Sequence, residues 1–303
     1  MRKAYEAIQN NKPKRKTIMI DRAKFGPGGN GDLFYATGGK GTADAPAWVK
    51  NYGLDAYEFE AGRGINAGEA VLRRIGEEAR AHGVAMSLHT PYFISLSGVD
   101  PEKRLKSIDY IQRSLWAAEL LGAKTIVIHS GSAAKISRAE AMKLSCDTLE
   151  KIIEAVGDTE VKLGIETMGK INQLGTLDEV IEQCQVDNHY VPVVDFGHMN
   201  ARERGGLFMS ADDYRRVFDR IALGCSDEVA KNLHCHFSKI EFTDAGEKRH
   251  LTFADETYGP AYEPLMEAIA REGLTPTIIC ESDGTQPEDA KAMKDYYCSI
   301  INE

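Results

Sequence analysis

The chain alternates between short apolar runs and longer amphipathic segments. Eight apolar runs follow one another along the sequence, at residues 17–20, 56–60, 84–89, 125–129, 161–166, 191–195, 233–237 and 276–282. Runs this short and this apolar are typical of strands that are buried in a parallel sheet. Each run therefore predicts one strand.

The segments between the runs carry the signals of helices. Apolar positions recur at helical spacing in residues 67–83, 107–123, 137–157 and 287–301. Gly83, Gly122 and Gly157 mark the C-terminal ends of the first three segments, and Ser137 is suited to cap the third. Helices thus separate most of the predicted strands.

Strand and helix alternate eight times, which predicts an α/β protein built as a single closed (β/α)8 (TIM) barrel. An open doubly wound sheet is the alternative, and it would place a glycine-rich turn after the first strand. Residues 25–31 ("FGPGGNG") lack the GxGxxG order and no helix obviously follows, so we interpret them as a mobile loop. We expect one domain over residues 17–303, preceded by a basic arm or short helix at residues 1–16.

Composition narrows the class of protein. The 303 residues are 43% hydrophobic and 27% charged, as in a soluble globular domain, and the net charge of −9 offers no overall basic field for nucleic acid, although a local patch is enough. The six cysteines lack CxxC spacing, which indicates reduced thiols. The first residues have no apolar core of a signal peptide. We expect a cytoplasmic protein with no membrane contact and no obligate protein partner.

Histidines and carboxylates stand at the ends of six consecutive predicted strands. They are His89, His129, Glu166, Asp195, His236 and Glu281. A buried, unpaired charge costs several kcal/mol, roughly, so such groups are usually paired or bind a metal. The C-terminal ends of barrel strands meet at one face, where catalytic residues lie. Mixed imidazole and carboxylate donors suit zinc, manganese or iron, so the pattern predicts a metal centre.

With these residues assembled, the chain resembles the endonuclease IV family of abasic-site nucleases, which are three-zinc (β/α)8 barrels. The similar segments, in the order of the family, are "SLHTPYFISL" (87–96), "VIHSGS" (127–132), "GIETMG" (164–169), "VVDFGH" (193–198), "KRHLTF" (248–253) and "IICES" (278–282). Individually these motifs are weak, but their shared order is specific. The resemblance covers residues 85–283.

The resemblance implies two or three Zn²⁺ ions per chain, with Mn²⁺ or Fe as alternatives. The implied ligands fall into three groups, the first two sharing a bridging carboxylate: His89, His129 and Glu166; Glu166, Asp195, His236 and Glu281; and His198 with His250. His234 shares a strand face with His236 but lies deeper, so we expect it to support the ligands from behind.

The third group departs from the family, because Lys248 stands where the family has an aspartate two residues before the last histidine. An ammonium group cannot bind a metal unless it is deprotonated. Either Glu247 or Asp244 takes the place of the aspartate, or Lys248 acts in catalysis by supplying positive charge where the family uses a metal.

The implied activity is metal-assisted hydrolysis of a phosphodiester, with abasic duplex DNA or another phosphodiester as substrate. Divalent ions lower the pKa of a water and stabilise the leaving 3′ oxygen, and Glu166 would fix their spacing. Tyr92 and Phe93 fall where the family inserts side chains into the duplex. Residues 1–84 do not match the family's DNA-gripping loops, which leaves Arg63 as a candidate phosphate contact.

Two other functions remain open. A sugar isomerase or epimerase of the xylose-isomerase-like barrels would hold a single metal with Glu166, Asp195, His236 and Glu281, and the two glutamates would exchange protons with the sugar. In that case His89, His129 and His250 are surplus, which favours the nuclease. The third alternative is a barrel that binds a metal or a ligand without catalysis.

Overall fold

The computed structural model describes residues 22–301. The basic arm expected at residues 1–16 and the strand expected at residues 17–20 lie outside these. Eight parallel strands form one sheet, and they are β1 (Lys24–Pro27), β2 (Ala56–Glu60), β3 (Ala85–His89), β4 (Thr125–His129), β5 (Lys162–Glu166), β6 (Tyr190–Asp195), β7 (His234–Phe237) and β10 (Thr277–Cys280). The order across the sheet is β1-β10-β7-β6-β5-β4-β3-β2.

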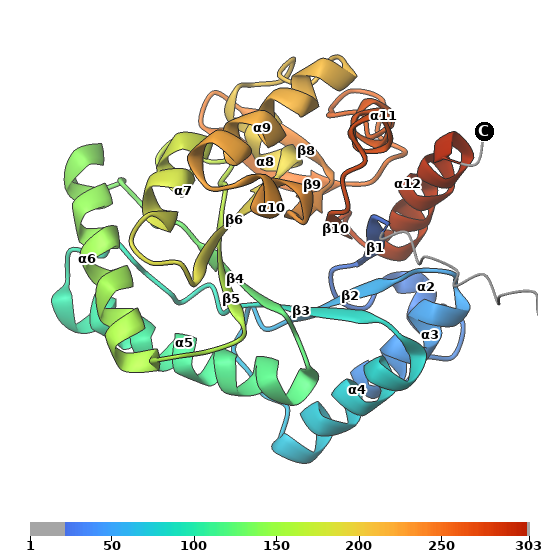
Figure 1. The fold of residues 1–303 in the computed structure, drawn as a ribbon, viewed down its shortest axis with the longest axis horizontal. Coiled ribbons are helices and arrows are strands. Elements are labelled where there is room, and N and C mark those ends of the chain that lie inside the picture. Colours follow the sequence, from blue (N-terminus) through green and yellow to red (C-terminus); the bar gives the residue numbers. More distant parts are fainter. Residues whose placement is uncertain (1–21, 302–303) are drawn as a thin grey trace, which may run out of the picture.

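The two edge strands of this sheet, β1 and β2, meet and close the barrel. Gly28 forms a parallel bridge with Glu58, and the N–H of Gly29 donates to the carbonyl of Glu58 at 3.0 Å. Helices surround the strands on the outside (Figure 1). The predicted TIM barrel is therefore confirmed, and the open doubly wound sheet is wrong.

The interpretation of residues 25–31 as a mobile loop is wrong in its first half. Phe25, Gly26 and Pro27 belong to β1, and the short helix α2 (Asp32–Ala36) follows them. A Cβ atom on Gly26 would lie 1.8 Å from the carbonyl oxygen of Ala56, so the approach of β1 to β2 requires glycine there. The glycine-rich stretch thus helps to close the barrel.

Three of the four predicted helices begin and end within two residues of the predicted positions, whereas the one predicted at 107–123 begins at Pro101, where Asp100 caps it. The predicted helices are α4 (Glu69–His82), α5 (Pro101–Leu121), α6 (Arg138–Val156) and α12 (Gln286–Ile301), and the others are η1 (Thr42–Asp44), α3 (Ala45–Asn51), α7 (Leu177–Cys184), α8 (Phe196–Arg202), α9 (Ala211–Gly224), α10 (Asp227–Lys231) and α11 (Glu263–Glu272). Gly83 and Gly122 end α4 and α5 in the left-handed conformation, at φ 65° and 69°. No helix within residues 22–301 is long and apolar enough to span a membrane.

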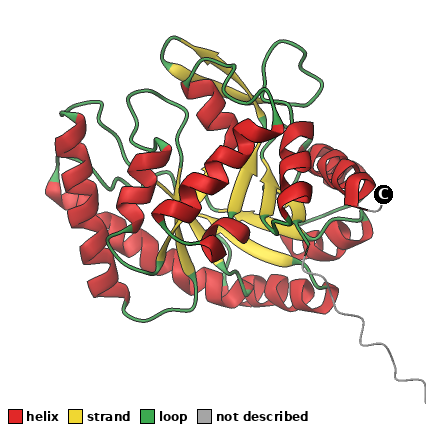
Figure 2. Cartoon of the chain, turned by 45° about the horizontal axis from the view of Figure 1, so that its top comes forward, coloured by secondary structure: helices red, strands yellow, loops and turns green. Residues whose placement is uncertain are grey.

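A hairpin that the hydrophobic pattern did not predict stands beside the barrel. It consists of β8 (Lys239–Thr243) and β9 (Gly246–Leu251), which form a two-stranded antiparallel sheet of their own and project beyond the barrel strands (Figure 2). The loop after β5 holds it in place, since the N–H of Glu247 donates to the carbonyl of Gly169 and the N–H of Ile171 to that of Ala245, both at 3.1 Å. The hairpin therefore brings β9 to the C-terminal face of the barrel.

Candidate metal centre

The C-terminal ends of the strands converge on a pocket of about 760 Å³. Its lining includes most of the ligands expected from the sequence, namely His89, His129, Glu166, His198, His250 and Glu281. Asp195 and His236 lie at the floor, fully buried. The fold thus brings together all eight expected ligands, which come from five strands of the barrel, the residue after β10, helix α8 and the hairpin.

The first expected group meets around Glu166 at the end of β5. Nε2 of His89 and Nε2 of His129 lie 3.7 and 3.4 Å from Oε2 of Glu166. The Nδ1–H of His89 donates to the carbonyl of Thr90 at 2.9 Å, which leaves Nε2 facing the pocket. One donor atom from each of the three residues lies within 4.8 Å of the others, close enough to hold one ion.

The second expected group shares Glu166 with the first. Oε1 of Glu166 lies 3.0 Å from Nδ1 of His236, and Oε1 of Glu281 lies 3.3 Å from the same nitrogen. Asp195 completes the group, since one donor atom from each of the four residues lies within 4.8 Å of the others. Glu166 presents its two oxygens to different groups, as a carboxylate that bridges two ions does.

In the third group, Glu247 rather than Lys248 joins the two histidines. Oε2 of Glu247 lies 3.5 Å from Nε2 of His198, whose Nδ1–H donates to a backbone carbonyl, and Glu247, His198 and His250 have donor atoms within 4.8 Å. Glu241 pairs with Arg249 and Phe242 with Glu247, so Lys248 is the extra residue of a β-bulge. Because of the bulge, the side chains of Glu247 and His250 lie on the same face of the hairpin.

Lys248 itself lines the pocket but points elsewhere. Its Nζ lies 2.6 Å from Oε1 of Glu241, and 54% of its side chain is exposed. Asp244, the other expected substitute, has a fully exposed side chain. Of the alternatives left open by the sequence, Glu247 is the one whose carboxylate lies between the two histidines.

The donor set fits divalent ions of the zinc class. It mixes imidazole nitrogens with carboxylate oxygens, which are the donors that these ions take in proteins. Oε2 of Glu166 and Oδ2 of Asp195 are buried and find no hydrogen-bond partner within residues 22–301. Buried oxygens of this kind are costly unless a partner arrives. A bound cation supplies that partner.

One residue of the first group, His89, carries a proton in the metal-free protein. This proton must leave before an ion can bind to the group. Burial lowers the pKa of His89, but the nearby carboxylates of Glu166 and Glu60 outweigh burial and raise it to about 10. Burial lowers the pKa of His129 to about 3. Burial raises the pKa of Glu166, but His236, His89 and His129 together hold it well below its usual value. Near neutral pH only His89 of this group is protonated.

We therefore expect zinc affinity to rise by about tenfold or more per pH unit between pH 6 and 8. The proton on His89 stabilises the metal-free fold fully below the ordinary pKa of 6.5, and this stabilisation is lost as pH rises through 10. Metal binding follows the opposite trend because it requires the deprotonated ring. Competition with a chelator, corrected for the chelator's own protonation, measures the slope, and a flat profile contradicts the expectation.

The expected substrate contacts differ in their relation to the pocket. Tyr92 lines it, 60% exposed, with its ring centroid 5.3 Å from that of His89 and 5.4 Å from that of His129. Phe93 is 55% exposed but packs on Tyr110 outside the lining. Arg63 is exposed on the loop after β2, also outside the lining. Tyr92 alone among the three borders the ligands.

Two glutamates on β2 belong to the site, and sequence reasoning missed both. Glu58 is fully buried inside the barrel, where it contacts His234 and His236 on β7. Glu60 ends β2 and lines the pocket. The available signal was the run "AYEFE" itself, in which carboxylates alternate with aromatic side chains. His234, expected behind the ligands, lies there and contacts Glu58.

A closed barrel with imidazoles and carboxylates at its strand ends defines this protein as a TIM barrel with a candidate metal centre. The chain belongs to the xylose isomerase-like TIM barrel family, whose model matches residues 46–297.

Individual relatives also share sequence with this chain. An uncharacterized protein of Methanocaldococcus jannaschii is 27% identical over 252 residues, which are 82% of this chain and 89% of that protein. A probable endonuclease 4 of Acholeplasma laidlawii is 33% identical over 191 residues, which are 62% of this chain and 63% of that protein. The chain thus spans under two thirds of the latter.

Two solved structures share the fold. Endonuclease IV from Thermus thermophilus superimposes with a TM-score of 0.68 and 19% identity, covering 92% of this chain and 99% of that one. A D-tagatose 3-epimerase-like protein gives a TM-score of 0.66 and 18% identity, covering 92% and 98%. At these identities the likeness establishes the barrel fold.

Proposed function

We propose that this protein is a metal-dependent phosphodiester hydrolase with two or three zinc-class ions at the C-terminal face of its barrel. The observation that carries the proposal is the division of the ligands into three groups, two of which share Glu166. A one-metal isomerase needs only the group of Asp195, His236, Glu281 and Glu166. His89, His129, His198, Glu247 and His250 form donor groups beyond that one.

The residues of the pocket suit a phosphodiester. Bound divalent ions supply Lewis acidity, which lowers the pKa of a water and polarises a phosphoryl oxygen. Glu166 sets the distance between the first two groups. Lys170 places a positive charge on the lining that favours an anionic substrate. Lys248 and Arg249 also line the pocket, and Glu241 pairs with both of them. Tyr92 offers an exposed ring beside the ligands, on which a base or sugar can pack.

We propose abasic duplex DNA as the substrate to test first, because relatives such as that of Acholeplasma laidlawii are named probable endonuclease 4. Cleavage would leave a 3′-hydroxyl and a 5′-deoxyribose phosphate.

The second candidate is a sugar epimerase that uses one ion. The group of Glu166, Asp195, His236 and Glu281 is complete by itself, and the barrel is as similar to an epimerase-like protein as to an endonuclease. In that reaction Glu166 and Glu281 would exchange protons with the carbon beside a carbonyl.

The deciding experiment combines metal content with two activity assays. Elemental analysis of protein purified without added metal or chelator is expected to give two or three ions per chain. Incubation with a labelled duplex that carries one abasic site is expected to nick that strand, while an intact duplex of the same sequence stays whole. One ion, no nicking and epimerisation of ketoses would support the second candidate. Bound metal without either activity would support a binding protein.

A further inference from the structure

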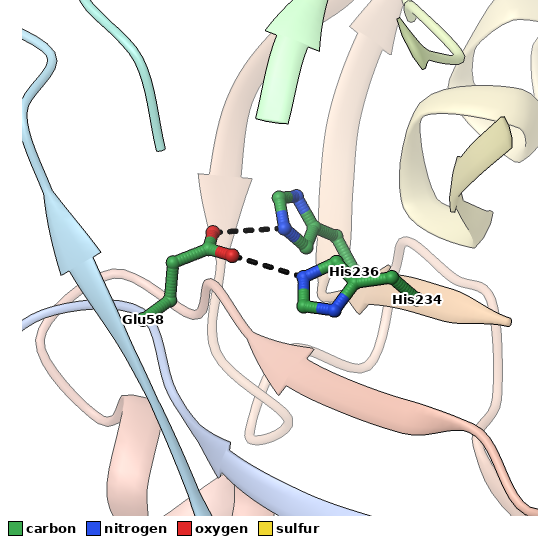
Figure 3. A group of neighbouring side chains, drawn as sticks. All are labelled: Glu58, His234 and His236. Atoms are coloured by element: carbon green, nitrogen blue, oxygen red, sulfur yellow. Dashed lines mark hydrogen bonds and ion pairs between the residues drawn. The ribbon is translucent and has the colours of Figure 1, made fainter. Parts of the chain in front are cut away.

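A cluster of buried polar side chains lies beneath the metal centre. Glu58 on β2 reaches across the barrel to His234 and His236 on β7 (Figure 3). β1 and β10 separate β2 from β7 along the barrel wall, so these contacts cross the interior. The exposed fraction is 0% for Glu58 and His236 and 7% for His234. A carboxylate this deep requires compensating partners.

Each oxygen of Glu58 has its own partners. Oε2 accepts hydrogen bonds from Oγ of Ser87 at 2.6 Å and from Nε2 of His234 at 2.9 Å. Oε1 lies 2.9 Å from Nε2 of His236. Oε1 of Glu58 and Nε2 of His236 form no hydrogen bond of regular geometry in the described chain, so the 2.9 Å ion-pair contact between them is what compensates each atom for its burial.

His236 therefore has one nitrogen at Glu58 and the other in the metal centre. Its Nδ1 lies 3.0 Å from Glu166 and 3.3 Å from Glu281. His89 and His198 are held differently, because a backbone carbonyl accepts the outer N–H of each ring. Of these three rings, His236 is the one whose outer nitrogen faces a carboxylate instead of a backbone carbonyl. An anionic acceptor makes the facing nitrogen a stronger donor to a metal than a carbonyl does.

We propose that Glu58 is a positioning residue for the metal centre: it holds the Nε2–H of His236 and so keeps the Nδ1 lone pair directed at the ion. Ser87 and His234 hold the carboxylate of Glu58 in turn. This inference rests on the proposed metal centre and adds to it a residue on β2 that touches neither ion nor substrate. Glu58 acts through the negative charge and the orientation of its carboxylate, because a side chain of the same volume without them would not select one tautomer of His236.

Glu58→Gln tests the inference because it keeps the volume and removes the charge. We expect zinc affinity, measured by competition with a chromogenic chelator, to fall about 10- to 100-fold. The visible absorption of the Co²⁺-loaded protein is expected to change, since one ligand is misaligned. The thermal midpoint of the metal-free protein should stay close to that of the wild type. Glu256→Gln makes the same chemical change on an exposed side chain and serves as the matched control.

His234→Gln is the second variant, because it replaces the imidazole that donates to Glu58 and leaves every expected ligand in place. A smaller loss of zinc affinity in the same direction is expected, and this variant decides the question where Glu58→Gln does not fold. Wild-type affinity and an unchanged Co²⁺ spectrum in the folded variants would overturn the inference, as would a fall in metal-free stability alone. A wild-type protein that binds no metal would overturn the proposed function instead.

Discussion

Replacing Glu166 by glutamine is expected to remove two of the bound ions and lower phosphodiester cleavage by about 10³-fold or more. The carboxylate is fully buried, and it contributes one oxygen toward His89 and His129 and the other toward His236. An amide has one oxygen and no charge, so it cannot serve both groups. Elemental analysis and a cleavage assay on the abasic duplex measure the two effects.

The third group gives this experiment an internal reference. His198, Glu247 and His250 do not include Glu166 as a ligand in their group, so about one ion is expected to remain in Glu166→Gln. Glu256→Gln, which alters an exposed carboxylate, should keep full metal content and activity. Full metal content in Glu166→Gln would rule out a bridging carboxylate at this position.

The barrel could be predicted from the sequence because its strands are buried on both faces and therefore read as apolar runs. The run at 125–129 has the same bounds as β4, and the polar residue at its end, His129, lies in the pocket. The first described strand was missed for a physical reason. Its sequence "KFGP" contains few apolar side chains. The close approach of Ala56 requires a glycine at position 26, where a buried strand would otherwise carry an apolar residue.

The site residues that the sequence could not assign are those whose position depends on which face of a strand they occupy. The alternating run "AYEFE" is typical of a strand with one solvated face, but here the polar face of Glu58 points into the barrel. Glu247 was one of two candidates, and the sequence could not select it because a regular strand puts residues 248 and 250, not 247, on one face. The bulge at Lys248 changes that alternation. The pairing that creates it is a tertiary feature, so spacing along the chain could not show it.

The contrast between Glu247 and Lys248 supplies the last prediction. Glu247→Gln is expected to lower the metal content by one ion and to reduce cleavage by about 10- to 100-fold, because its carboxylate lies 3.5 Å from His198 and the amide removes the charge. Lys248→Met should keep every ion, since its ammonium group lies on Glu241 and 54% of the side chain is exposed.

The two variants also separate the roles kinetically. Loss of positive charge from the pocket lining in Lys248→Met should raise KM for a DNA substrate by less than about tenfold and weaken its salt dependence. In Glu247→Gln the loss should appear in kcat, because the ion that this group would hold near the reacting phosphate is lost. Metal analysis and steady-state kinetics at two salt concentrations distinguish these results. Loss of an ion from Lys248→Met with full metal content in Glu247→Gln would reverse the assignment of the third group.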